Sequence, residues 1–155
     1  MLLAVDLGLR TGLALYGRDG RLVSYRSQNL GSKSRLRRAA GAVLADHPDA
    51  GRVVLEGGGD LAELWTRAAE RSGRRARVID AHVWRRALLL PREQRHGADA
   101  KAAADGLARA VIEWSGAPRP KGPLRHDAAE AIAIGLWGVL DAGWLDAVPD
   151  EVGRR

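Results

Sequence analysis

Two acidic residues end short apolar runs in the first half of the chain. Glu56 follows residues 52–55, whose Val-Val-Leu core is typical of a buried strand, and three glycines come directly after it. An ionised side chain there is costly unless it is paired or bound to a cation, and glycines leave open space beside it. Asp6 follows the apolar residues 2–5 and stands beside a glycine-containing turn. Asp near glycine is also common in plain turns, so Asp6 alone is weak evidence for a site.

A second pair of acids opens the last long apolar segment. Asp127 and Glu130 are three residues apart, so they share one face of the helix predicted there, and the alanines around them allow close packing on a sheet. An acidic first turn can also serve only to complement the helix dipole. The apolar residues that continue the helix favour a buried position, which would carry at least one of the two acids inward.

Together these acids form a set of oxygen ligands. The chain has no cysteine and four histidines, so the set suits Mg²⁺ or Mn²⁺ better than zinc. Two such ions, about 3.5–4 Å apart, can activate a water and stabilise the leaving oxygen of a phosphodiester. The residue types therefore predict a site with two Mg²⁺ ions, for which Mn²⁺ can substitute, and cleavage of phosphodiester bonds.

The charge balance agrees with a polyanionic partner. The chain carries 25 Lys and Arg against 19 Asp and Glu, a formal charge of +6, and its sequence pI is near 10.6. Ordinary surface composition can also produce this balance, so charge by itself identifies no function. The absence of cysteine excludes disulfides and thiolate zinc sites. With no basic leader and no run of about 18 apolar residues, we expect a cytoplasmic protein without a membrane partner.

The elements that must position these acids follow from periodicity and turn residues. An Asp19-Gly20 turn favours three antiparallel strands at the start, and Asp60 with Glu63 resembles a capping box for the helix that follows Glu56. In order, we expect strands 2–5, 13–16 and 21–27, helix 34–46, strand 52–55, a helix from Asp60 towards Gly73, strand 76–79, helix 84–90, a mobile loop 92–97, helix 99–114, a linker 116–125 and helix 126–140.

This order predicts an α/β fold. The length of 155 residues fits one domain, for which we expect residues 1–147 with a disordered tail over 148–155. Strands at the start followed by alternating helices and strands favour a mixed central sheet of five strands, the first three antiparallel, flanked by helices.

The sequence resembles the RuvC family of Holliday-junction resolvases in three segments, Leu-Ala-Val-Asp6-Leu-Gly, Val-Leu-Glu56 and Asp127-Ala-Ala-Glu130-Ala-Ile. The resemblance extends over most of the chain. It implies an RNase H-like fold and a structure-selective, Mg²⁺-dependent endonuclease that cuts four-way DNA junctions by a two-metal-ion mechanism. It makes these four acids the catalytic and metal-binding residues, although the family usually has Asp where this chain has Glu130.

The resemblance also implies contacts with DNA. The segment from Gly97 to Lys101 is similar to one in which the family's Lys contacts DNA near the scissile phosphate, so Lys101 takes that catalytic and nucleic-acid-binding role; without the resemblance it is an ordinary exposed Lys. His126 is an auxiliary candidate that would orient a water or a metal, against a plain role at the helix end. The other basic residues expected to bind DNA are Arg10, Lys33, Arg35, Arg85 and Arg86.

Two departures from the family bear on junction recognition. Gly59 stands where bacterial resolvases place an aromatic residue that stacks in the opened junction, and the first turn is about one residue shorter, with Leu7 in place of a proline. Trp84, beside two arginines, is the better surface candidate for stacking. The apolar faces that hold Trp65, Trp114 and Trp137 favour core positions for these three residues.

The resemblance further implies a homodimer, because symmetric cutting of a four-way junction needs two sites related by a two-fold axis. Nothing in the residues identifies a branch-migration motor as a partner. Three alternatives remain open. The first is a non-catalytic nucleic-acid-binding module of the same fold. The second is an actin-like or sugar-kinase phosphotransferase, disfavoured by the length. The third is a RuvX-type protein acting on ribosomal RNA, disfavoured by the Val-Leu-Glu segment and the final acidic pair.

Overall fold

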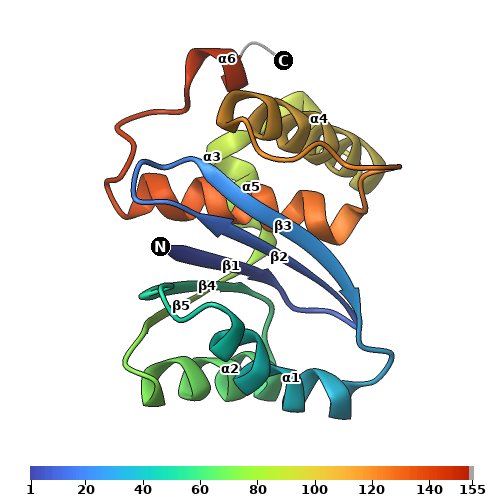
Figure 1. The fold of residues 1–155 in the computed structure, drawn as a ribbon. Helices are drawn as coiled ribbons and strands as arrows, with labels where there is room; N and C mark the ends of the chain where they lie inside the picture. Colours follow the sequence, from blue (N-terminus) through green and yellow to red (C-terminus); the bar gives the residue numbers. More distant parts are fainter. Residues whose placement is uncertain (154–155) are drawn as a thin grey trace.

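A five-stranded mixed sheet runs through the middle of the computed structural model, which describes residues 1–153 (Figure 1). The strand order is β3-β2-β1-β4-β5. β1 pairs antiparallel with β2 and β2 with β3, whereas β1, β4 and β5 run parallel. The strands are β1 (Leu2–Asp6), β2 (Arg10–Tyr16), β3 (Leu22–Asn29), β4 (Arg52–Glu56) and β5 (Arg75–Ile79). The α/β class and the five-stranded mixed sheet are therefore confirmed.

Helices cover both faces of this sheet. In Figure 1, α1 and α2 lie below the sheet, and α3, α4 and α5 lie above it. Successive residues of a strand point to opposite faces, so Leu2 and Ala4 pack under α5 while Leu3 and Val5 pack over α1 and α2. The helices are α1 (Lys33–Asp46), α2 (Gly59–Arg71), α3 (Ala81–Leu88), a 3₁₀ turn η1 (Pro91–Gln94), α4 (Gly97–Ser115), α5 (His126–Asp141) and α6 (Asp150–Gly153).

α5 is the central helix of the upper layer. It packs against β1 and β2 and against α4, and its residues from Asp127 to Val139 are almost all buried. Close approach to the sheet requires glycine, because a Cβ on Gly135 would lie 2.2 Å from the ring of Tyr16. The fully buried Tyr16 hydroxyl donates a hydrogen bond of 2.6 Å to the carbonyl oxygen of Ile132. The glycine contact and this hydrogen bond together fix the position of α5 relative to β2.

Loss of this hydroxyl should weaken the fold measurably. We expect Tyr16→Phe to lower the free energy of unfolding by about 1 kcal/mol, because it removes one buried hydrogen bond without leaving a large void. Urea unfolding followed by circular dichroism measures the effect. Tyr25→Phe is the matched control, since the Tyr25 hydroxyl donates to the Pro118 carbonyl at an exposed position and should contribute less. Equal losses in both variants would contradict the role given to Tyr16.

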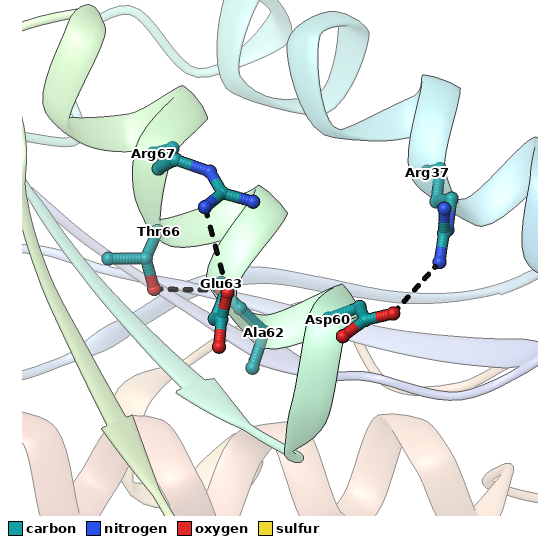
Figure 2. Close-up of polar contacts among 6 residues, drawn as sticks. All are labelled: Arg37, Asp60, Ala62, Glu63, Thr66 and Arg67. Carbon is teal, nitrogen blue, oxygen red and sulfur yellow. Dashed lines mark hydrogen bonds and ion pairs between the residues drawn. The ribbon is translucent and has the colours of Figure 1, made fainter.

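Several local expectations differ from the structure. Asp60 does not cap α2: the N-cap is Gly58 and makes no side-chain cap bond. Asp60 instead forms an exposed ion pair with Arg37 of α1 at 3.6 Å, and Glu63 pairs with Arg67 one turn further along its own helix (Figure 2). The capping-box interpretation was therefore wrong, because the helix begins at Gly59 and places Asp60 inside its first turn.

The segments expected to be irregular are also more ordered. Residues 92–94 of the expected loop belong to η1, in which the Glu93 carboxylate accepts from the Leu90 N–H at 2.8 Å. The disordered tail is wrong for the described part of residues 148–155, because residues 150–153 form α6 on α4 and bury Val152 completely. Residues 154–155 lie outside the described part of the chain. Among residues 1–153, no helix is both long enough and apolar enough to cross a lipid bilayer.

Candidate active site

Asp6 and Glu56 lie side by side at one edge of the sheet. They are the last residues of the parallel strands β1 and β4 and are direct partners in the ladder, which places their backbones about 4.8 Å apart. The Leu7 N–H continues the ladder by donating to the Glu56 carbonyl at 2.9 Å. Asp6 has the parity of Leu2 and Ala4, and Glu56 has the parity of Val54, so both carboxylates leave the sheet on the side of α5.

α5 brings its first turn to the same place. Gly12 is the β2 partner of Asp6, and a Cβ built on Gly12 would lie only 1.8 Å from the Asp127 carbonyl oxygen. The backbone of α5 therefore touches β2 beside Asp6, an approach that only glycine permits. Glu130 follows one turn later on the same helical face as Asp127. Three elements far apart in sequence thus meet at one sheet edge.

The four carboxylates repel one another electrostatically. Burial, together with the negative charges of Glu130, Glu56 and Asp127, raises the pKa of Asp6 to about 8. Burial also raises the pKa of Glu56, against the opposing effect of a hydrogen bond from Trp84. Such mutual repulsion between acids is what a bound cation relieves. The convergence expected from the sequence is present in the electrostatics of the folded chain.

Asp127 gives a second indication of a cation. Its side chain is 8% exposed, and its Oδ2 atom is buried without a hydrogen-bond partner among the described residues. A buried carboxylate oxygen without a donor costs free energy unless a ligand satisfies it. A donor set made of carboxylate oxygens fits Mg²⁺ or Mn²⁺ by its chemistry.

α3 supplies two side chains that sequence reasoning placed wrongly. Trp84, expected at the surface for stacking, is fully buried, and its indole N–H donates to Glu56 Oε2 at 2.5 Å. Arg85, expected to contact DNA, donates from Nη2 to Glu130 Oε1 at 3.0 Å and is only 29% exposed. The two residues contact acids on different elements, and the sequence alone does not indicate such contacts. The only signal in the sequence was that Trp84 and Arg85 are adjacent.

In these side-chain positions the acids do not form a closed cage. Among residues 1–153, no group of three or more His, Asp or Glu side chains is arranged closely enough to hold an ion as it stands. Two of the four acids point to other partners, since Glu56 accepts from Trp84 and Glu130 accepts from Arg85. Each of these two bonds uses one carboxylate oxygen, Glu56 Oε2 and Glu130 Oε1, and leaves the second oxygen of each acid for another partner.

The other candidate residues lie at the surface. Lys101 is exposed in the second turn of α4, and none of its contacts within the described residues joins it to the acids. His126 is the exposed first residue of α5, with Arg125 as the N-cap, so its place is in the first helical turn. The remaining exposed basic candidates are Arg10 at the start of β2, Lys33 and Arg35 at the start of α1, and Arg86 on α3.

The tryptophans and Gly59 limit how a nucleobase can stack. Trp65 and Trp137 are buried as expected, whereas Trp114 is only partly buried. Gly59 has open space around its Cα, because a Cβ there would meet nothing within 4 Å. A cavity of about 440 Å³ lies beside it, lined by residues of α2 that include Thr66 and Arg67 (Figure 2), and none of the four acids lines this cavity.

No family model matches the chain, and no functionally characterised protein matches it significantly. A proposal for function must consequently be argued from three observations: the acid cluster, the strand order and the excess of basic residues. The cluster is the most specific of the three, because four carboxylates from three elements share one sheet edge and repel one another.

Proposed function

We propose that this protein is a metal-dependent endonuclease with an RNase H-like fold that cleaves branched DNA, four-way junctions in particular. The observation that carries the proposal is the set of four acids at the ends of β1 and β4 and at the start of α5, with one buried carboxylate oxygen of Asp127 lacking any donor. The strand order β3-β2-β1-β4-β5, antiparallel first and parallel afterwards, supports the RNase H-like assignment.

Asp6, Glu56, Asp127 and Glu130 would hold two Mg²⁺ ions. When bound, such ions activate a water and stabilise the leaving oxygen of a phosphodiester. The chain's own contribution is positioning: the sheet fixes Asp6 and Glu56 at adjacent strand ends, and α5 carries the other two acids on one face. Lys101 and the exposed arginines would neutralise phosphates around this acidic centre.

The preference for four-way junctions and a homodimeric, cytoplasmic protein are the parts of the proposal that rest on the resemblance to the RuvC family. A dimer with two-fold symmetry would place two acid clusters on the two strands to be cut. Neither of the two positions considered for a stacking aromatic supplies one, because position 59 is glycine and Trp84 is buried. Cleavage should accordingly be selective for branched structure while tolerating more than one kind of branch.

A cleavage assay tests the proposal. Labelled four-way junctions, flaps, plain duplexes and RNA–DNA hybrids are incubated at one salt concentration with Mg²⁺, with Mn²⁺ or with EDTA. We expect nicks in the branched DNA with either metal and none in EDTA. If all four substrates stay intact with both metals, the proposed activity is wrong.

A non-catalytic nucleic-acid-binding module is the second candidate. One observation favours it, namely that no three acids form a ready cage in the described residues. Calorimetric titration with Mn²⁺ separates the two candidates, because a nuclease must bind the ion at Asp6 and a decayed module need not. Absence of Mn²⁺ binding together with retained junction binding would favour the module.

A further inference from the structure

Arg85 lies inside the acid cluster instead of on its rim. Its guanidinium reaches from α3 to Glu130 of α5 at 3.0 Å, and the two side chains are 29% and 17% exposed. The guanidinium carbon also lies 5.2 Å from the centre of the Trp84 ring, whose own N–H holds Glu56. Two adjacent residues of α3 thus form hydrogen bonds with two of the four acids.

The guanidinium performs the electrostatic task that a bound metal would perform. Arg85 is the cation whose charge lowers the pKa of both Asp6 and Glu56, against the repulsion from the neighbouring acids. Its Nε atom is buried and has no hydrogen-bond partner among the described residues, so the guanidinium is only partly satisfied where it lies. An incompletely bonded cation in a cluster of acids can be displaced at a lower cost than a fully bonded one.

Metal ions and this guanidinium would compete for the same acids. A divalent ion held by Glu130 would bring two positive charges close to Arg85, and like charges in a partly buried site repel strongly. An ion that takes both oxygens of Glu130 would also compete with Arg85 for Oε1.

We propose that Arg85 is a built-in counter-ion that pairs with Glu130 and competes with divalent ions for the acids, so that it lowers the metal affinity of the cluster. This inference rests on the proposed function, since it takes the four acids as the metal ligands. It replaces the surface DNA-binding role expected for Arg85. The counter-ion protects the folded chain from the repulsion among its acids, at the expense of weaker metal binding.

The test measures Mn²⁺ affinity without any DNA, by isothermal titration calorimetry and by the electron paramagnetic resonance signal of free Mn²⁺. The proteins are the wild type, Arg85→Gln, Arg85→Lys and the control Arg86→Gln, which makes the same chemical change at the exposed neighbouring position. We expect Arg85→Gln to bind Mn²⁺ about 5- to 50-fold more tightly than the wild type, a range typical of coupling between sites. Arg85→Lys keeps the charge, so its Mn²⁺ affinity should stay within a few-fold of the wild-type value. Arg86→Gln should have the same Mn²⁺ affinity as the wild type.

A purely structural role for Arg85 predicts a change in Mn²⁺ affinity of the opposite sign. If Arg85 only orients Glu130 as a ligand, its removal would leave the carboxylate misplaced and would weaken Mn²⁺ binding. Equal or weaker binding by a folded Arg85→Gln protein therefore overturns the counter-ion role. If Arg85→Gln does not fold, Arg85→Ala or Arg85→Met serves as the neutral variant. Tighter Mn²⁺ binding by that variant then supports the counter-ion role, and equal or weaker binding overturns it.

The same experiment separates this inference from the proposed function. Adding Asp6→Asn to the wild type and to Arg85→Gln should remove Mn²⁺ binding in both, which locates the ion at the cluster. If the wild type binds Mn²⁺ and cleaves DNA but Arg85→Gln binds no more tightly, only the counter-ion role is wrong. If neither protein binds Mn²⁺, the metal-dependent function and the counter-ion role are both wrong.

Discussion

The Asp6→Asn protein is expected to make no nick in branched DNA with Mg²⁺ or Mn²⁺, and yet to unfold at a higher temperature than the wild type in metal-free buffer. Asp6 lies between Glu56 and the two acids of α5, and burial with their charges raises its pKa to about 8. Asn keeps the shape and removes the charge, so the proposed metal site loses a ligand while the fold loses a source of repulsion. A gain of about 1 kcal/mol would raise Tm by roughly 2–4 °C in a chain of this size.

The stability gain should depend on pH in a defined direction. The folded pKa of Asp6, about 8, lies above its ordinary value of 3.8, so the folded state binds more protons than the unfolded state between these values. The stability of the metal-free wild type should therefore fall as pH rises from about 4 to about 8, the interval between the unfolded and folded pKa. Asp6→Asn should flatten much of this slope.

Chemical unfolding at a series of pH values in EDTA, followed by a nicking assay in Mg²⁺, measures both effects. Asp46→Asn is the control, because Asp46 is an exposed acid that makes only a surface ion pair with Arg26 at 3.4 Å. It should leave cleavage and the pH slope unchanged. Cleavage at the wild-type rate by Asp6→Asn would contradict the site, and an unchanged pH slope would contradict the electrostatics of the cluster.

Gly12→Ala is expected to cause the largest loss of stability of any single added methyl group. Its Cβ would lie 1.8 Å from the Asp127 carbonyl oxygen and 2.4 Å from the carbonyl carbon, both of which belong to backbone that is fixed in α5. α5 must move off the sheet to make room, and overpacking of this kind costs about 3 kcal/mol or more. Because α5 carries Asp127 and Glu130, DNA cleavage should fall at the same time even at temperatures where the variant stays folded.

Gly41→Ala gives a control of opposite sign. Gly41 lies in the middle of α1 with nothing within 4 Å of its would-be Cβ, so alanine there should stabilise the helix by about 0.5–1 kcal/mol. Urea unfolding of both variants and a nicking assay below the transition measure the effects. Gly12→Ala with wild-type stability would mean that α5 does not touch β2 where the structure places the contact.

Periodicity and turn residues predict the elements and their order well, because the signals are local. The apolar runs before Asp6 and Glu56 became β1 and β4, and the alanine-rich segment after His126 became α5, with the acids where expected. The side chains of successive strand residues alternate between the two faces of a sheet. Two acids that are partners at the ends of parallel strands therefore share a face. These facts need no knowledge of what packs on the sheet.

The inaccurate predictions concern contacts between elements. Trp84 beside two arginines looks like an exposed cationic patch, but the amphipathic helix α3 turns the indole inward, where a buried N–H must find an acceptor. Arg85 follows it into the cluster because Glu130 of α5 lies within its reach. Asp60 was expected to be a cap because Asp commonly fills that position, yet the glycines before it allowed the helix to begin earlier.

The spacing of the acids along the chain has a consequence for synthesis. Asp6 and Glu56 leave the ribosome early, but Asp127 and Glu130 come from α5, which is also the helix that covers the upper face of the sheet. A nascent chain that stops before α5 has half of the ligands and exposes the apolar residues that α5 buries. The core and the acid cluster are therefore completed together, late in synthesis, and an unfinished chain lacks two of the four acids that the proposed nuclease activity needs.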